Sequence, residues 1–281
     1  MVKLKKVFEI IGLLSLASFS FFITEKTTSV FENVDIIMIQ IKENYKKYNI
    51  NSQDATIDNN TIIPGVYGKE VNIKKSYKKM KKNGYYSKDM YVYDYKKPNI
   101  SLNDNIDKYI ISGNKNNRYI SLIFKVSDKL ENILKIIDKY NIKTSFFVTN
   151  TYFEEHNDLI IELIKKGHII GNLSNNLDYS DPSFGWMDTI IKSLTNQKQG
   201  YCYYTNNTNN LDYCVKYKNY TIKPIEIKNN LLNEVKNNLK NGAMLSFEIS
   251  NNQIKELDSI INYIISKGYE IVNINKLLNE K

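Results

Sequence analysis

A glycine separates a predicted helix from a short apolar strand in the segment Lys166-Gly167-His168-Ile169-Ile170-Gly171-Asn172. The same arrangement returns at residues 241–245 (Asn-Gly-Ala-Met-Leu) and 267–271 (Lys-Gly-Tyr-Glu-Ile). A glycine just past a helix adopts the left-handed backbone that ends it, and the apolar run that follows is typical of a buried parallel strand. The pattern therefore predicts an α/β fold whose parallel sheet is either open or closed into a barrel.

Short apolar runs mark the predicted strands of this sheet, and amphipathic helices lie between them. We expect strands near residues 120–124, 145–149, 168–172, 244–247 and 270–273. The first helix has an apolar stripe from Leu130 to Ile137, with Ser127 as its N-cap, and the last has one from Leu257 to Ile265. In such a sheet the active face lies at the carboxyl ends of the strands.

Composition limits the classes of function. The chain has 281 residues, 42% of them hydrophobic, which is enough for one sizeable core plus an N-terminal extension. Its net charge of +9 comes almost wholly from lysine, because Arg118 is the only arginine. AT-rich codon bias explains this composition, and attraction to anionic wall polymers or lipid headgroups is the functional alternative. The lysines are scattered, and the chain lacks a group of arginines that could make bidentate hydrogen bonds to bases or phosphates. Both features argue against nucleic acid as a partner.

The N-terminus predicts a membrane segment at residues 1–24. Lys3, Lys5 and Lys6 precede an apolar run at residues 7–23 that only Glu9 and small hydroxyl residues interrupt. The basic flank predicts that the N-terminus stays inside and the bulk of the chain outside. A signal anchor is favoured over a cleaved signal peptide, because the apolar run continues past the weak cleavage pattern at residues 18–20. We expect a bacterial protein that is anchored with an extracytoplasmic domain, or secreted if this segment is cleaved.

Segments rich in polar and turn-forming residues divide the rest of the chain into three parts. Residues 25–63 are expected to form a helix, near 29–48, and a polar stem. Residues 64–118 are expected to form a small pre-domain packed on the barrel, with a basic helix near 76–82 and a strand near 90–95. The tyrosines of that strand (Tyr91, Tyr93 and Tyr95) share one face and serve either packing or sugar stacking. Residues 119–281 form the main domain.

The two cysteines, Cys202 and Cys214, predict a disulfide, since an exported chain leaves the reducing cytosol. Two free buried thiols are the alternative. A zinc pair is less credible, because the cysteines are not in a Cys-x-x-Cys arrangement and the chain has only two histidines.

Four stretches of the main domain resemble the NodB-type polysaccharide deacetylases in order and spacing. They are residues 123–128 (Ile-Phe-Lys-Val-Ser-Asp), 144–150 (Thr-Ser-Phe-Phe-Val-Thr-Asn), 167–177 (Gly-His-Ile-Ile-Gly-Asn-Leu-Ser-Asn-Asn-Leu) and 242–248 (Gly-Ala-Met-Leu-Ser-Phe-Glu). The resemblance covers residues 119–279 and implies an irregular parallel (β/α) barrel. It also implies hydrolysis of an N-acetyl group with the help of a divalent metal such as zinc.

The residues that carry this chemistry in the family are replaced here. Where the first motif has two aspartates, a general base and a metal ligand, the chain has Lys125 and Val126. Where the second motif has two metal-binding histidines, it has Leu173 and Leu177. A lysine acts as a base near neutral pH only if burial lowers its pKa by several units, and valine and leucine bind no cation.

Two later motifs also differ from the family pattern. Tyr201-Cys202-Tyr203-Tyr204 stands where the family has Arg-Pro-Pro-Tyr, and Glu248 stands at the position of a late catalytic histidine. Neither histidine of the chain replaces a lost ligand: His168 matches a family histidine that packs structurally, and His156 lies in a charged helical segment.

The sequence therefore predicts a degenerate deacetylase-like domain with no catalytic residue, metal or cofactor of its own. The leading hypothesis is binding or scaffolding on peptidoglycan or another amino-sugar polymer. The alternative is a residual or metal-free hydrolase that uses Glu248, Asp178 or Lys125. The candidate ligand-binding residues are Lys125, Asn172, Asp178, Tyr203, Tyr204 and Glu248. If Leu173 and Leu177 fill the cavity, the mouth of the barrel is a plugged core and any binding takes place elsewhere.

Overall fold

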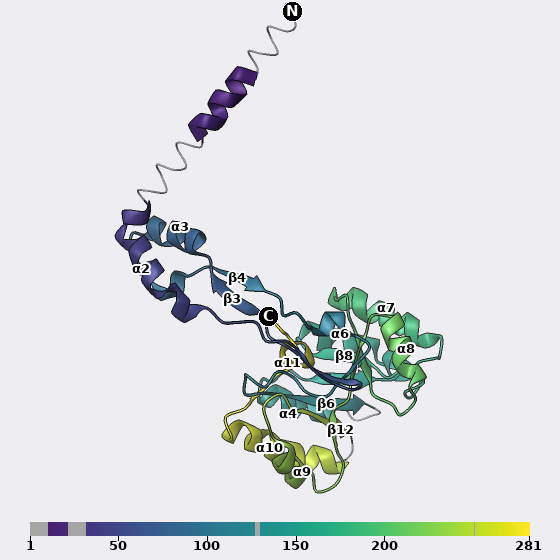
Figure 1. Cartoon of the computed structure of the whole chain (residues 1–281). Coiled ribbons are helices and arrows are strands. Elements are labelled where there is room, and N and C mark those ends of the chain that lie inside the picture. The colour runs from purple at the N-terminus through teal and green to yellow at the C-terminus, as the bar shows by residue number, and fades with distance from the viewer. Residues whose placement is uncertain (1–10, 22–31, 127–129, 250) are drawn as a thin grey trace, which may run out of the picture. The chain divides into compact units, whose positions relative to one another are not determined.

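The computed structural model describes residues 11–21, 32–126, 130–249 and 251–281 (Figure 1). The chain forms two compact units, one from the segment ending at residue 51 together with 68–96, and the other from 52–67 and 97–281. The chain thus leaves the larger unit after residue 67 and re-enters it at residue 97. This division differs from the expected boundaries at residues 63 and 118.

The smaller unit packs two helices and a two-stranded sheet around its own core. Its elements are α2 (Ile36–Asn44), the 3₁₀ turn η1 (Tyr45–Tyr48), β3 (Gly68–Val71), α3 (Ile73–Asn83), the 3₁₀ turn η2 (Lys88–Met90) and β4 (Tyr93–Lys96). The expected basic helix is α3, which Asn72 caps by accepting from the backbone N–H of Lys75. Tyr91 is buried in this unit's core with Ile41 and Met80, whereas Tyr95 is exposed.

Residues 56–63, expected within a loose stem, instead form a hairpin of the larger unit. Strands β1 (Thr56–Asp58) and β2 (Thr61–Ile63) pair antiparallel, and β2 joins the main sheet by pairing with β5 (Tyr109–Ile110). Asn59 turns the chain with a left-handed φ of 50°. The sequence carries this signal, because asparagines flanked by β-branched residues favour a hairpin turn.

The main sheet has 11 strands among the described residues. Its remaining strands are β6 (Tyr119–Val126), β7 (Ser145–Val148), β8 (Ile169–Asn172), β9 (Tyr201–Tyr203), β10 (Tyr220–Ile222), β11 (Ile225–Ile227), β12 (Met244–Glu248) and β13 (Glu270–Ile271). The order is β1-β2-β5-β10-β9-β8-β7-β6-β12-β11, with β13 beside β6, and every pair except β1–β2 is parallel.

The predicted parallel α/β fold and its five strands are confirmed, and of the open and closed forms that the sequence allowed, the sheet takes the open one. Strand pairing runs from one edge at β1 to another at β11, so the sheet is a curled half-barrel. The three repeated glycines have the expected left-handed backbone, with φ of 87°, 80° and 76°. At Gly242 a side chain is also excluded by contact, because a Cβ there would overlap the carbonyl oxygen of Gly113.

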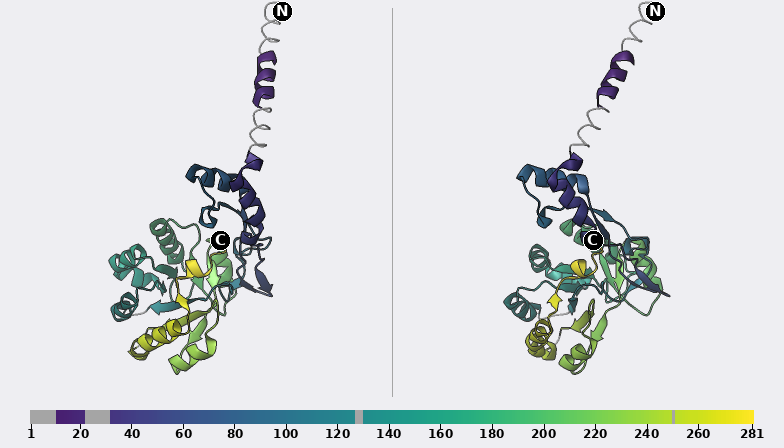
Figure 2. Two further views of the ribbon diagram at one scale, coloured as in Figure 1. Left: turned by 90° about the vertical axis from the view of Figure 1, so that its left-hand side faces the viewer. Right: turned by 60° about the vertical axis from the view of Figure 1, so that its left-hand side comes forward.

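Helices cover one face of the sheet. They are α4 (Leu130–Lys139), α5 (Asn150–Glu155), α6 (Asn157–Lys165), α7 (Ser183–Thr195), α9 (Leu231–Asn238) and α10 (Asn251–Ser266), with α8 (Asn209–Lys216) beside β10. The views in Figures 1 and 2 agree in placing α9 and α10 side by side. The apolar stripes of α4 and α10 are buried against the sheet as predicted, except that Ile265, at the end of the α10 stripe, is exposed. Ser127, the expected cap of α4, lies outside the described residues.

The other face of the sheet encloses a second apolar core. Its members include Ile123, Phe147, Leu173 and Tyr203, and the short helix α11 (Ile274–Leu277) packs among them. The backbone N–H of Ile274 donates to Oγ of Ser145, the first residue of β7. Helix α11 therefore lies at the amino ends of the strands, opposite the end where the active face is expected.

Residues 11–21 are helical, and the apolar side chains there are exposed. Within the described part of the chain, no helix combines the length and apolar character needed to span a membrane. The predicted anchor at residues 1–24 extends beyond that part of the chain on both sides of the helix, and it stays a prediction.

Candidate functional site

An ion pair lies at the carboxyl ends of β6 and β12, where the sequence predicts the site. Lys125 and Glu248 are direct partners in the parallel ladder, and Nζ of Lys125 lies 2.6 Å from Oε1 of Glu248. The Lys125 side chain is only 17% exposed, whereas that of Glu248 is 66% exposed. The lysine is therefore a partly buried cation that already has a counterion.

Glu226, in β11, is a second counterion that the sequence reasoning missed. Its Oε1 lies 3.6 Å from Nζ of Lys125, and Lys228 pairs with its other carboxylate oxygen. The hydrogen bond from Lys228, followed by the positive charge of Lys125, lowers the pKa of Glu226 although burial opposes this. The mouth thus holds an ionised network of two lysines and two glutamates.

Tyr203 extends from β9 beneath this network. Its hydroxyl is 2.9 Å from Oγ of the buried Ser246 and 3.3 Å from Oε1 of Glu226. The ring lies edge-on to Phe147, with a centroid distance of 5.6 Å, and is 2% exposed. Burial raises the pKa of the hydroxyl far above its ordinary value, so it serves here as a neutral hydrogen-bonding group. Tyr203 is packed inside the half-barrel and offers no free ring face.

Period-two alternation separates the other predicted site residues. Lys125 faces the mouth, so the next residue, Val126, turns to the opposite face and is buried beside α4. In the same way Tyr204 points away from Tyr203 and packs edge-on against Tyr109. The structure thus brings Lys125, Tyr203 and Glu248 together and leaves Val126 and Tyr204 outside this group.

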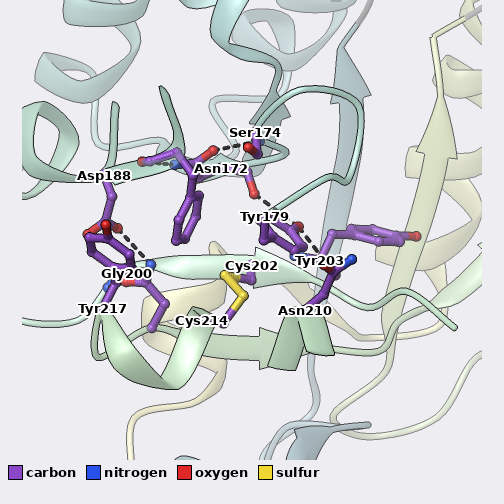
Figure 3. The surroundings of a disulfide bond; sticks show 12 residues. Asn172, Ser174, Tyr179, Asp188, Gly200, Cys202, Tyr203, Asn210, Cys214 and Tyr217 are labelled. Carbon is purple, nitrogen blue, oxygen red and sulfur yellow. Dashed lines mark hydrogen bonds between the residues drawn. A yellow bond between two sulfur atoms is a disulfide. The ribbon is translucent and has the colours of Figure 1, made fainter. Parts of the chain in front are cut away.

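The loop after β8 is held by the motif residues that the chain shares with the deacetylases (Figure 3). A Cβ at Gly171 would overlap the Phe147 ring, so this glycine makes room for the core. The Asn172 amide donates to the carbonyl oxygen of Phe184 and accepts from the backbone N–H of Ser174. Both ends of this side chain have partners within the fold, which leaves Asn172 no free group for a ligand.

Tyr179 fastens the same loop to β9. Its buried hydroxyl accepts from the backbone N–H of Tyr203 at 2.8 Å and lies within hydrogen-bonding distance of the carbonyl oxygens of Asn172 and Tyr203. Asp178, a predicted ligand-binding residue, accepts at Oδ1 from the backbone and hydroxyl of Ser180. Asp178 is therefore a turn residue in this structure.

Leu173 and Leu177 occupy the two histidine positions within one turn of chain. The backbone N–H of Leu177 donates to the carbonyl oxygen of Leu173 at 2.6 Å. Leu173 is 5% exposed in the apolar core, and Leu177 packs partly buried against the same core with a left-handed φ of 71°. The side chain of Asn210 fixes this strained position by donating to the carbonyl oxygen of Leu177.

These residues do not fit the divalent metal that the resemblance implies. A metal site needs nitrogen, sulfur or oxygen donors, and the three ligand positions hold hydrocarbon side chains. No group of three or more histidine, cysteine, aspartate or glutamate residues in the described chain is arranged to hold a metal ion.

Both histidines lie elsewhere. His168 is 2% exposed, and its Nδ1 accepts from the backbone N–H of Thr144 while the ring packs edge-on against Phe146. Burial lowers the pKa of His168 to about 4. His156 ends α5 and stacks on Tyr152. Both are structural residues.

The predicted disulfide is confirmed: Cys202 in β9 is bonded to Cys214 in α8, with a Cα–Cα distance of 6.3 Å (Figure 3). Both cysteines are fully buried beside Tyr179 and Phe184. Close by, the buried carboxylate of Asp188 accepts from Asn219, whose side-chain oxygen accepts from the backbone N–H of Gly200. The disulfide therefore lies in a buried, hydrogen-bonded region that packs beneath the loop after β8.

Part of this chain matches a known protein family. Residues 112–225 match the family model described as polysaccharide deacetylase. The uncharacterised protein YlxY of Bacillus subtilis (strain 168) is 25% identical over 289 residues, which cover 90% of this chain and 87% of YlxY.

Solved structures share the fold. BA3943 from Bacillus anthracis, described as a CE4 family pseudoenzyme, is 23% identical with a TM-score of 0.65, and the match covers 88% of this chain and 96% of BA3943. A mutant of BA3943, described as having restored enzymatic activity, has a TM-score of 0.66 at 22% identity over 88% of this chain and 99% of its own. The Bc1960 peptidoglycan N-acetylglucosamine deacetylase is 18% identical with a TM-score of 0.51 over 60% of this chain and 92% of its own.

The four motif stretches, the matched family model and the shared fold all agree. Residues 112–225 therefore belong to the polysaccharide deacetylase family, and the chain around them shares the fold of the solved structures.

Proposed function

We propose that this protein is a non-catalytic polysaccharide deacetylase homologue that binds an amino-sugar polymer of the bacterial cell surface, such as peptidoglycan, without removing its acetyl groups. One observation carries the proposal: Val126, Leu173 and Leu177 occupy the three metal-ligand positions of the family's motifs in a chain that keeps the family's α/β fold. Without a metal-polarised water, the family's hydrolysis has no nucleophile.

The position of the general base supports the same conclusion. Lys125 is held between the carboxylates of Glu226 and Glu248. Its amino group is therefore engaged in ion pairs and is not placed to activate a water molecule. The description of BA3943 as a pseudoenzyme is a precedent for an inactive protein with this fold.

The polymer is chosen by analogy with relatives. Bc1960 is described as acting on peptidoglycan N-acetylglucosamine. We extend the polymer, and not the reaction, to this chain. The N-terminal segment would hold the protein at the membrane with residues 32–281 outside, which protease treatment of intact cells tests directly.

The experiment measures zinc content, deacetylation and binding on the same purified full-length protein. We expect no stoichiometric metal, no acetate release from acetylated chitooligosaccharides or peptidoglycan, and co-sedimentation with insoluble peptidoglycan. Turnover with bound metal would overturn the proposal. Metal-independent turnover that is lost in Glu248→Gln would instead support the residual hydrolase.

A further inference from the structure

A hollow lies at the amino ends of the strands, opposite the eroded mouth. Its volume is about 250 Å³, and all of its lining residues belong to the larger unit. Tyr201 and Tyr220, the first residues of β9 and β10, form one wall with ring centroids 6.0 Å apart. Tyr67 adds a third ring. An aromatic wall of this kind suits the apolar face of a sugar ring or an organic cation.

Glu280 supplies a buried carboxylate to this hollow. It is 7% exposed, and its Oε1 accepts from the backbone N–H groups of Gly65 at 2.9 Å and Leu102 at 3.1 Å. Its other oxygen, Oε2, has no hydrogen-bond or ion-pair partner within the described chain. A carboxylate with one fixed and one free oxygen is a ready acceptor for an ammonium group.

Asn103 and Asn275 add two amides to the polar lining, which also includes Gln199 and Asn279. Oδ1 of Asn103 accepts from the hydroxyl of Tyr220, and Oδ1 of Asn275 accepts from that of Tyr201, each at 2.5 Å. Both amide oxygens are thus committed, and the Nδ2 groups have no acceptor among the residues described. They are oriented donors for the hydroxyl oxygens of a ligand.

The surroundings favour a positive ligand. Burial raises the pKa of Glu280, and burial followed by the charges of Glu280 and Asp104 raises the pKa of Tyr220 to about 12. Two lysines are close by: Lys97 already pairs with Asp104 at 2.6 Å, and Lys281 is itself part of the lining. A cation in the hollow would give the buried carboxylate of Glu280 a counterion.

We propose that this hollow binds a de-N-acetylated amino sugar, with the ammonium on Glu280, the hydroxyls on Asn103 and Asn275, and the ring against the tyrosines. The proposal rests on the proposed function for the choice of an amino-sugar polymer, and it moves recognition from the mouth to the opposite end of the sheet. The protein would then bind the product of its catalytic relatives, because an acetylated amine has no positive charge for the carboxylate.

The test is calorimetric titration of the full-length protein, in detergent, with chitosan tetramer and with its fully acetylated counterpart at mildly acidic pH. We expect the chitosan tetramer to bind at least about tenfold more tightly, as expected from one charge-assisted hydrogen bond. Glu280→Gln should abolish this preference while keeping an acceptor for Gly65 and Leu102. Tyr67→Leu, at a half-buried position, should weaken the binding of both tetramers. This variant tests the site if Glu280→Gln does not fold.

Glu162→Gln, which removes a surface ion pair with Lys166 outside both the hollow and the mouth, is the matched control and should leave the affinity unchanged. Equal affinity for the two tetramers, or no binding of either, overturns the proposal. Loss of binding in Glu248→Gln with retention in Glu280→Gln would place the ligand at the mouth, which rejects this site but not the proposed function.

Discussion

Nζ of Lys125 lies 2.6 Å from Oε1 of Glu248, across a ladder position where two residues of the family's catalytic strand ends meet. With Glu226 on its other side, the lysine neutralises a mouth that would otherwise present two adjacent carboxylates. The pair occupies the position of the family's base and late histidine, which makes this end of the sheet a closed ionic network.

Replacing Lys125 should leave the carboxylates of Glu226 and Glu248 to repel each other. In Lys125→Met we expect the pKa of Glu226 to rise, because one of the charges that lowers it is gone. The loss in free energy of unfolding should be about 1 kcal/mol or less, since Glu248 is mostly solvated. Carboxyl NMR titration and urea unfolding measure the two effects. Lys139→Met, which breaks the surface pair with Asp258, is the control and should leave Glu226 unchanged.

The sequence predicts most of the fold because its signals are local. Gly167, Gly242 and Gly268 mark helix ends directly, and the two cysteines have only one possible internal pairing. The hairpin at residues 56–63 was missed although the turn around Asn59 indicates it, because the polar composition of the surrounding segment suggested a stem.

The site was less predictable, because its members come from different strands. Glu226 approaches Lys125 only because β11 lies at the sheet edge beside β12, and sequence spacing does not give strand order. The alternation of side chains along a strand does place Val126 and Lys125 on opposite faces of the sheet. It therefore predicts that Val126 does not lie at the mouth. The hollow around Glu280 joins residues from Tyr67 to Lys281, so no local motif could reveal it.

The disulfide should carry much of the stability of the loop region. Closing a loop with a sequence separation of 12 contributes about 3 kcal/mol. We expect the double variant Cys202→Ala, Cys214→Ala to lose about that much free energy of unfolding. Wild-type protein should lose stability on adding reductant, and the double variant should not respond. An equal response of the two would show that the bond does not constrain the unfolded chain.

His168 should make stability depend on pH. Its pKa is about 4 in the folded protein, against an ordinary value of 6.5. Above the ordinary value the imidazole is neutral in both states. As pH falls from there toward 4, the unfolded chain takes up a proton that the buried ring refuses. Stability should therefore fall by up to about 3 kcal/mol across that window.

Denaturant unfolding at a series of pH values measures this loss. In His168→Gln, which keeps a hydrogen-bond acceptor for Thr144, the loss across the window should shrink by the amount that the histidine contributes. His156→Gln, at the partly exposed end of α5, should retain the wild-type profile. A pH profile that is identical in wild type and His168→Gln would contradict the buried neutral imidazole.

Restoring the family's donors tests how much of the metal site survives in the backbone. The variant combines Lys125→Asp, Val126→Asp, Leu173→His and Leu177→His. Histidine tolerates the left-handed backbone at position 177, and both leucines contact the same core. Val126 is the obstacle, since it is 2% exposed on the helix-covered face and an aspartate there is a buried, unpaired carboxylate. Without metal, we expect this variant to be about 3 kcal/mol or more less stable than wild type.

Added zinc should recover part of that loss, because a metal that binds only the folded state raises the melting temperature. The control replaces the two leucines with glutamine, which matches the polarity of histidine without its affinity for zinc. If the restored variant keeps native circular dichroism but zinc does not shift its melting temperature beyond the control, position 126 is turned away from the mouth. The BA3943 mutant with restored activity is the precedent for success. Failure here would trace to β6, which continues as regular strand through Val126 and so directs that side chain to the helices.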